Sequence, residues 1–202
     1  MARRRFGTKS SETRAQLLDL AEQLMRDEGY AAITSRRLGS FAGLSPQIVY
    51  YYFKTMDELF EALLLRIFDA HYAALDEAGS ADDPLLAMWL LSCDPARATI
   101  TAELMALANH RKDLSSLIGK FNEKFSARQI EILDTEFAAR GIEFPGWPIE
   151  AIAAVMENTA RGFAFGRNYE LANQIDAQLL ITRYIESLRI PSSAVDREGQ
   201  GG

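Results

Sequence analysis

Apolar residues recur at helical spacing along almost the whole chain. The first such stripe consists of Leu17, Ala21, Leu24 and Met25. Ser10 or Ser11 is suited to cap this helix at its start, and Gly29 is suited to end it. No run of β-branched residues alternates with polar ones in the way that predicts a strand. We therefore expect an all-α protein of about nine helices.

Two short helices separated by a glycine turn are predicted within residues 33–54. Thr34 is a suitable N-cap for the first of them, whose inward positions are Leu38 and Phe41. Gly43 can adopt the positive φ of a tight turn. The Ser45-Pro46 pair then marks the start of the next helix, with serine as the cap and proline at the first helical position.

A further helix begins near residue 55, and longer helices follow it. Thr55 and Glu58 have the spacing of a capping box. The apolar stripe of this helix is Leu59, Leu63, Ile67 and Ala70. Residues 79–84 interrupt the pattern, after which we expect helices over 84–92, 95–109, 111–140, 148–168 and 173–189. Residues 191–202 are polar and rich in glycine, which predicts a disordered tail.

The order of elements within residues 33–54 is that of a helix-turn-helix, in which the second helix enters the DNA major groove. Val49 and Tyr52 should face inward with Leu38 and Phe41. The outward positions of the second helix are Pro46, Gln47, Ile48, Tyr50 and Tyr51. An outward Ile beside two Tyr indicates a surface that a partner covers. DNA suits it, because thymine methyl groups, base edges and phosphates can contact Ile48, Gln47 and the tyrosines respectively.

These segments also resemble a known family. They are Thr34-Ser35-Arg36-Arg37-Leu38, Ala42-Gly43-Leu44-Ser45-Pro46, Ile48-Val49-Tyr50-Tyr51-Tyr52-Phe53-Lys54 and Met56-Asp57-Glu58-Leu59. Over about residues 12–66 the chain is similar to the N-terminal domain of TetR/AcrR-type repressors. The resemblance implies a homodimeric repressor with a three-helix DNA-binding head, a palindromic operator, and a helical body that binds an effector and forms the dimer.

The resemblance divides the chain into three parts. It implies a basic arm and helix-turn-helix domain over residues 1–54, an effector-binding and dimerisation domain over 55–190, and the tail. Two positions depart from the family pattern: Tyr52 stands where His is common, and Gln47-Ile48 replaces a pair of smaller residues. Both departures concern which operator is read.

The family's DNA contacts can be carried over to this chain. Thr34, Ser35, Arg36 and Lys54 are expected to contact phosphate. Of the two adjacent arginines, Arg36 is favoured over Arg37. The residues expected to face the major groove or its walls are Ser45, Pro46, Gln47, Ile48, Tyr50 and Tyr51. Arg3, Arg4 and Arg5 form an arm that follows the DNA backbone or a minor groove, or else remains a solvated tail.

The distribution of charge agrees with a head that meets a polyanion. Residues 1–54 contain nine Lys and Arg and five Asp and Glu, for a net charge of +4. Because the whole chain carries −6, the remaining residues sum to −10. A basic tail on an ordinary acidic protein would give the same numbers, so charge alone leaves both interpretations open.

The last two predicted helices favour a dimer, although closing the core of one chain is the alternative. The large residues of the first form the stripe Ile152, Met156, Thr159 and Phe163, and its small ones are Ala160, Gly162, Ala164 and Gly166. The second helix carries Ile175, Leu179, Thr182, Tyr184, Ile185 and Leu188. Two such helices from each of two chains can form a four-helix interface.

The middle helices offer apolar walls and polar anchors for a small ligand. The predicted ligand-binding residues are Trp89, Met105, Asn109, Phe121, Phe125, Trp147, Asn158 and Phe163. Further candidates are Phe165, Glu103, His110 and Arg161. For any one of these aromatic residues, ordinary core packing is the commoner role.

The remaining sequence argues against an enzyme. The single Cys93 is expected to be a buried apolar residue, and two histidines, His71 and His110, make a histidine-ligated metal site improbable. No phosphate-binding glycine loop or nucleophile motif is present, so we expect no cofactor and no metal. No run is long and apolar enough to cross a membrane, and a cytoplasmic location is expected. The alternative function is a helical protein-interaction module without sequence-specific DNA binding.

Overall fold

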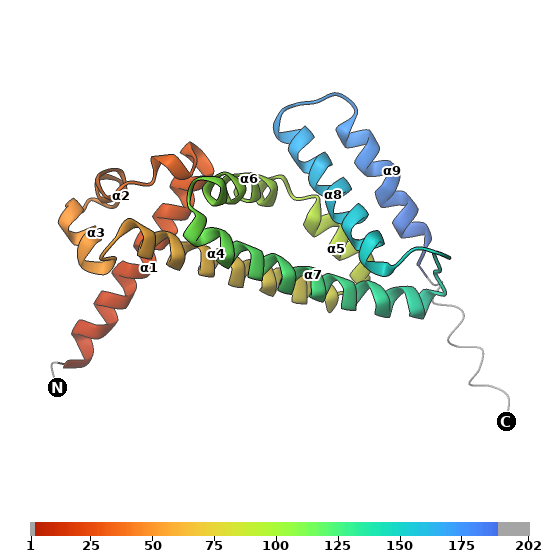
Figure 1. The fold of residues 1–202 in the computed structure, drawn as a ribbon, viewed down its shortest axis with the longest axis horizontal. Coiled ribbons are helices and arrows are strands. Elements are labelled where there is room, and N and C mark those ends of the chain that lie inside the picture. The colour runs from red at the N-terminus through yellow and green to blue at the C-terminus, as the bar shows by residue number, and fades with distance from the viewer. Residues whose placement is uncertain (1–2, 190–202) are drawn as a thin grey trace. The chain divides into compact units, whose positions relative to one another are not determined.

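The computed structural model describes residues 3–189, with side chains described from residue 12 onward. Within this range the regular structure consists of nine α-helices and one short 3-10 helix, without a strand (Figure 1). The prediction of an all-α protein is therefore confirmed. The side chains of Arg3, Arg4 and Arg5 and the predicted tail over residues 191–202 lie outside the described residues.

The helices of the first half begin and end near the predicted signals. They are α1 (Arg3–Glu28), η1 (Tyr30–Ala32), α2 (Ser35–Ala42), α3 (Pro46–Tyr52) and α4 (Met56–Gly79). The prediction that α1 starts after Ser10 or Ser11 is wrong, because the helix already begins at Arg3. Arg and Lys are good helix formers, so the helix extends through this stretch without needing a serine cap.

The helices of the second half lie within two residues of their predicted bounds. They are α5 (Pro84–Ser92), α6 (Pro95–His110), α7 (Lys112–Arg140), α8 (Ile149–Asn168) and α9 (Gln174–Ser187). Asp83 caps α5, since its carboxylate accepts a hydrogen bond from the backbone N–H of Leu86 at 3.2 Å.

The chain divides into two compact units that are discontinuous in sequence. Of the described residues, the first contains those up to 71 and 99–121, and the second contains 72–98 and those from 122 onward. The first unit therefore extends beyond the expected head of residues 1–54. It includes most of α6, which the sequence assigned to the body. Helices α4 and α7 each contribute to both units.

The core of the first unit joins the helix-turn-helix to α4 and α6. Leu38 and Val49 are fully buried in it, as predicted, and Tyr52 packs against it. The prediction that Phe41 faces inward is wrong, because α2 turns Leu38 and Ala42 toward the core and leaves Phe41 40% exposed. Ala70 is also exposed, contrary to the predicted stripe of α4.

The core of the second unit is built from α5, α7, α8 and α9. Its largest buried side chain is Trp89, and Ile152, Met156 and Phe163 of α8 pack against the same core. Part of the stripe predicted for a dimer interface thus closes the core of its own chain. Cys93 is buried, as predicted. Burial, together with the negative charge of Glu157, raises the pKa of its thiol to about 12.

Candidate nucleic-acid interface and ligand pocket

The turn between α2 and α3 is held by short-range contacts. Thr34 caps α2, and its Oγ1 accepts a hydrogen bond from the backbone N–H of Arg37 at 3.1 Å. Gly43 ends the helix at a φ of 67°, in the left-handed region that glycine tolerates. The backbone N–H of Leu44 donates to the carbonyl of Gly39 at 2.8 Å. A Cβ on Gly39 would lie 2.9 Å from the Leu44 carbonyl oxygen, so this position also requires glycine.

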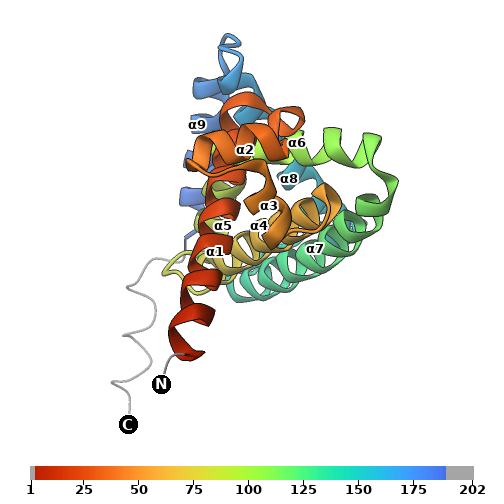
Figure 2. The ribbon, with the colours of Figure 1, turned by 90° about the vertical axis from the view of Figure 1, so that its left-hand side faces the viewer.

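Helix α3 is anchored on one side and open on the other. Ser45 is extended and precedes Pro46 at the first helical turn, and Val49 fixes the buried side. Ile48, Tyr50 and Tyr51 are exposed, with Tyr51 the most exposed of the three at 74%. Gln47 is also exposed, whereas Pro46 is half-buried. The predicted outward face is thus observed, apart from the partial burial of Pro46. Helices α1, α2 and α3 of this unit face the viewer in Figure 2.

The chain after α3 is fixed by a variant of the predicted capping box. The backbone N–H of Glu58 donates to Thr55 Oγ1 at 3.0 Å, as a capping box requires. The Glu58 carboxylate accepts from the backbone N–H of Lys54 at 2.8 Å, one residue before the cap. The backbone of Lys54 is thereby held in place while the residue itself remains exposed.

The two adjacent arginines of α2 differ in their partners. Arg37 forms an ion pair with Glu28, and the hydrogen bond from Arg37 lowers the pKa of the Glu28 carboxyl. Arg36 is exposed and has no ion pair among the described residues. Arg36 is therefore the more available cation of the two at the start of α2.

Helix α6 supports the helix-turn-helix from within the same unit. The Glu103 carboxylate accepts a hydrogen bond from the backbone N–H of Tyr30 at 2.7 Å, next to Gly29 with its φ of 85°. Arg111, directly after α6, pairs with Asp57 near the start of α4. The sequence offered Glu103 only as a further ligand anchor. Its contact with Tyr30 joins residues far apart in the chain, and no local pattern signals it.

The second unit contains an apolar pocket of about 460 Å³. Helices α5 and α7 and the following loop line it with Leu85, Trp89, Phe137, Ile142, Phe144 and Trp147. Helices α8 and α9 line it with Ala151, Ile152, Val155, Met156, Ile181, Tyr184, Ile185 and Leu188. Its volume falls within the usual range of small-molecule sites.

The structure brings only two of the predicted ligand-binding residues to this pocket. Trp89 and Trp147 line it. Met105, Asn109 and Phe121 belong to the first unit, as do Glu103 and His110. Phe125, Phe163 and Phe165 lie in the second unit outside the lining, and Phe163 packs edge-on against Trp89 at 6.2 Å between ring centroids. The other lining residues were not predicted as ligand contacts, because their separation in sequence hides their proximity.

The predicted polar anchors of α8 have partners within the chain. Asn158 donates to the backbone carbonyl of Ala154 at 2.8 Å. Arg161 pairs with Glu157 at 2.8 Å, and Ser92 and Gln129 also donate to the Glu157 carboxylate. Burial alone would raise the pKa of Glu157, but these three hydrogen bonds outweigh it and hold the pKa below its usual value.

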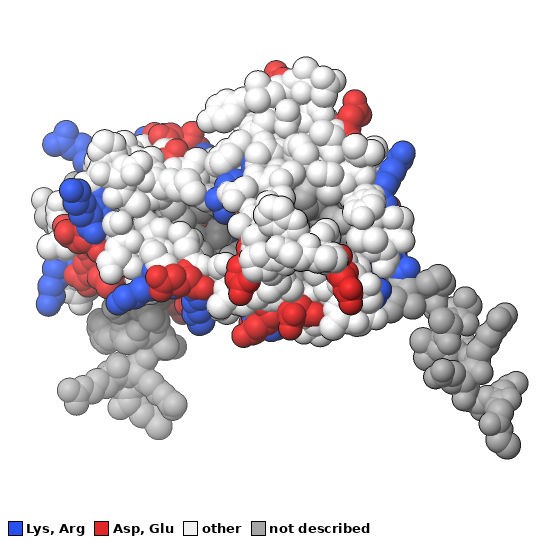
Figure 3. All heavy atoms as spheres, turned by 45° about the vertical axis from the view of Figure 1, so that its right-hand side comes forward, with Lys and Arg blue, Asp and Glu red and all other residues white. Residues whose placement is uncertain are grey.

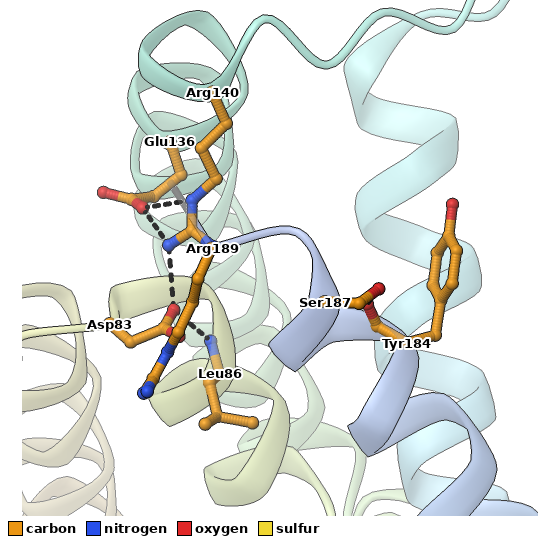
Figure 4. Close-up of polar contacts among 7 residues, drawn as sticks. All are labelled: Asp83, Leu86, Glu136, Arg140, Tyr184, Ser187 and Arg189. Atoms are coloured by element: carbon orange, nitrogen blue, oxygen red, sulfur yellow. Dashed lines mark hydrogen bonds and ion pairs between the residues drawn. The ribbon is translucent and has the colours of Figure 1, made fainter. Parts of the chain in front are cut away.

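An ionic cluster joins the ends of three helices in this unit (Figure 4). Asp83 before α5 binds Arg140 at the end of α7 at 2.8 Å, and it also pairs with Arg189 after α9. Arg140 additionally pairs with Glu136 at 2.6 Å. Burial alone would raise the pKa of Asp83, but the hydrogen bonds from Arg189, Arg140 and the Leu86 N–H lower it overall. The cluster therefore depends on an ionised Asp83.

Helices α8 and α9 leave large apolar side chains exposed. These are Val155, Ile175, Leu179, Leu180 and Tyr184, with Tyr169 and Leu171 in the connection between the helices. Gly162 of α8 has open space where a side chain would lie. Figure 3 shows that much of the surface over these two helices lacks charged residues. An apolar surface of this kind indicates a place where another molecule binds.

Comparison with known proteins finds matches to the N-terminal part of the chain. Residues 17–63 match the family of bacterial regulatory proteins described as the tetR family. The HTH-type transcriptional regulator TtgR of Pseudomonas putida is 32% identical over 84 residues, which cover 41% of this chain and 40% of that protein. The probable HTH-type transcriptional regulator ArpR of the same species gives the same identity and coverage. The matched segment thus spans two fifths of the length of these curated relatives.

Solved structures share the fold over most of the chain. A putative TetR-family regulator from Rhodococcus sp. has a TM-score of 0.67 at 20% identity, covering 88% of this chain and 98% of that one. A putative regulator from Saccharomonospora viridis in complex with choline has a TM-score of 0.73 at 14% identity, covering 88% and 95%. The ketosteroid regulator KstR2 of Mycobacterium tuberculosis has a TM-score of 0.61 at 20% identity, covering 87% and 92%.

Residues 17–63 thus match the tetR family, and the chain shares its fold with solved structures of TetR-family regulators. No helix among residues 3–189 is long and apolar enough to span a membrane.

Proposed function

We propose that the protein binds a palindromic operator as a homodimer, represses transcription there, and is released by a small apolar or amphipathic effector. The observation that carries the DNA-binding part is the open face of α3. Gln47, Ile48, Tyr50 and Tyr51 project from a helix whose opposite side is fixed by the buried Val49. Arg36 and Lys54 lie on either side of this face in the sequence. Such a protein acts where the genome is, in the cytoplasm.

The face divides into residues that read bases and residues that contact phosphate. Gln47 can form hydrogen bonds with a base edge, and Ile48 can contact a thymine methyl group. Thr34, Ser35 and Arg36 at the start of α2 and Lys54 after α3 supply phosphate contacts, and the hydroxyls of Tyr50 and Tyr51 add to them. Ser45 and Pro46 begin the reading helix and border the groove.

Dimerisation through α8 and α9 is supported by their exposed apolar residues outside the pocket lining, among them Ile175, Leu179 and Leu180. A single helix-turn-helix makes few contacts, and two of them about 34–36 Å apart would fit successive major grooves. Leu180 is 72% exposed in one chain, so its replacement should leave the fold of that chain intact. Leu180→Asp should therefore shift the mass measured in solution from dimer toward monomer. An unchanged mass would contradict this interface.

Release by an effector requires two states with different affinities for it. An effector that lowers operator affinity 100-fold must bind the released state more tightly by about 2.7 kcal/mol. Helix α4 contributes to both units and therefore offers a continuous path between them. An effector that binds free and DNA-bound protein equally well would contradict this mechanism.

The salt dependence of DNA binding tests the proposal without knowledge of the operator. Affinity for a mixed-sequence duplex, measured by fluorescence anisotropy, should fall with salt with a slope of about −0.9 per phosphate neutralised. Lys54→Ala should reduce this slope by about 1. Lys112→Ala is the matched control, because Lys112 is an exposed lysine of the same unit on α7.

The alternative function makes the opposite prediction. A helical protein-interaction module would show no salt-sensitive affinity for DNA, and Lys54→Ala would behave like Lys112→Ala. The exposed Ile48, Tyr50 and Tyr51 would then be a contact surface for a protein.

A further inference from the structure

The charge of the residues that line the pocket in the second unit sets the kind of ligand it can hold. No lining residue is charged. The indole N–H of Trp89 already donates to Thr182 Oγ1 at 2.9 Å, so this buried donor is occupied. The Tyr184 hydroxyl is the other strong hydrogen-bonding group among the lining side chains, and Tyr184 is largely exposed. In Figure 4 its ring stands apart from the ionic cluster.

The depth of the pocket favours a small molecule over a protein surface. Leu85 and Trp89 are almost completely buried, whereas Trp147, Val155 and Tyr184 are exposed. The lining thus runs from an exposed rim to a buried base. A flat protein surface would cover the rim and leave the base unfilled, whereas a compact molecule can reach Trp89.

The charged groups near the pocket are already engaged or lie outside its lining. Glu157 is held by Ser92, Gln129 and Arg161. Asp83 is held by Arg140 and Arg189. One nitrogen of Arg140, Nη1, is buried without a partner among the described residues, but Arg140 does not line the pocket.

One acidic residue lies close by without joining the lining. Asp134 borders a neighbouring hollow of about 250 Å³ that shares Phe144 and Trp147 with the pocket. A charged ligand within the pocket itself would lose its hydration and gain no opposite charge, which is costly.

We propose that this pocket binds an uncharged, predominantly apolar small molecule and discriminates against anions and cations of the same shape. The inference narrows the effector class and relies on the proposed function only for the effect on DNA. The preference of the pocket for an uncharged molecule follows from its uncharged lining and its buried base.

Three probes with one aromatic skeleton test the discrimination. They are 1-pyrenemethanol, the 1-pyrenemethylammonium cation and the 1-pyrenecarboxylate anion. The two tryptophans of the chain, Trp89 and Trp147, both line the pocket, so energy transfer from tryptophan to pyrene reports binding there. We expect the alcohol to bind the full-length protein at least tenfold more tightly than either ion. Equal or tighter binding of an ion would overturn the proposal, and preference for the cation would point to Asp134.

A pair of substitutions locates the binding. Ala151 lines the pocket, so Ala151→Phe should fill it and weaken binding of 1-pyrenemethanol at least tenfold. Ala139→Phe is the matched control, because Ala139 is exposed on α7 and outside the lining. If Ala151→Phe fails to fold, Trp147→Ala serves instead, because it removes an exposed wall of the pocket. This variant should bind 1-pyrenemethanol more weakly, and the emission of directly excited pyrene measures the binding. Unchanged affinity in a folded lining variant would contradict the site.

Failure of this inference can be told apart from failure of the proposed function. Salt-sensitive DNA binding without a preference for 1-pyrenemethanol would refute the pocket and leave the regulator. Selective binding of 1-pyrenemethanol without DNA binding would refute the regulator and leave the pocket.

Discussion

The two units of the chain differ in how completely each one buries its apolar side chains. In the first, α1, α2, α3, α4 and α6 enclose a core with Leu17, Leu38 and Leu63 fully buried. Its exposed apolar residues include a group on the short helix α3. In the second, Trp147 is 70% exposed and an open pocket reaches the buried Trp89, which is 2% exposed. The first unit encloses its core, whereas the second unit leaves a pocket open to a buried tryptophan.

The largest effect should come from the closed core. Leu38→Ala removes a fully buried side chain and should lower the free energy of unfolding by about 4 kcal/mol, with loss of DNA binding. Leu65→Ala is the matched control on α4, since Leu65 is 45% exposed. Urea unfolding measures the free energy of unfolding of both variants. A similar loss in the two variants would mean that burial does not distinguish these positions.

The ionic cluster of the second unit should give the next effect. Asp83→Asn leaves Arg140 with fewer partners in a buried site. The substitution should lower the free energy of unfolding by about 3 kcal/mol at pH 7. The pKa of Asp83 in the folded protein lies below its usual value of 3.8. The contribution of Asp83 to the free energy of unfolding is therefore present above pH 3.8. It is lost as the pH falls through the lowered folded pKa.

Unfolding measured at pH 7 and again at acid pH checks this linkage. The difference between wild type and Asp83→Asn should shrink as the pH falls below 3.8. A difference that stays constant would show that the charge of Asp83 is not the cause.

A smaller effect should separate base reading from phosphate contact. Gln47→Ala should weaken the free energy of DNA binding by about 1–3 kcal/mol at one base pair of the site, and it should change the preferred sequence. Tyr50→Phe removes only a hydroxyl and should weaken all sequences alike. Anisotropy titrations with duplexes that differ at single positions distinguish the two outcomes. If Gln47→Ala weakens every duplex equally, the division of roles on α3 is wrong.

The smallest effect concerns the start of α2. Thr34→Ala removes the acceptor for the Arg37 N–H and should lower the free energy of unfolding by about 1 kcal/mol. Thr34→Ser keeps the acceptor and is the control. Thermal unfolding of both variants measures the effect, and equal melting temperatures would argue against a capping role.

The parts of the fold that depend on contacts between residues close together in the chain could be predicted from the sequence. Thr34, Gly43 and Ser45-Pro46 mark helix ends through contacts within a few residues, and these bounds were found correctly. Phe41 was placed wrongly, because the face that α2 buries depends on how it packs against other helices.

The pocket could not be predicted in the same way. Its walls come from α5, α7, α8, α9 and the loop before α8. Trp89 and Tyr184 lie far apart in the sequence, and their shared site arises only from packing. The contact of Glu103 with Tyr30 has the same origin. The exposed face of α3 was found because helical periodicity within one short helix suffices to define it.

The most direct test of the account is selection of bound duplexes from a random DNA pool, with the mass of the protein measured in the same buffer. We expect a dimer to recover a palindrome with half-sites about one helical turn apart. Recovery of no common sequence, together with binding that disappears at moderate salt, would contradict it and favour a protein-interaction module.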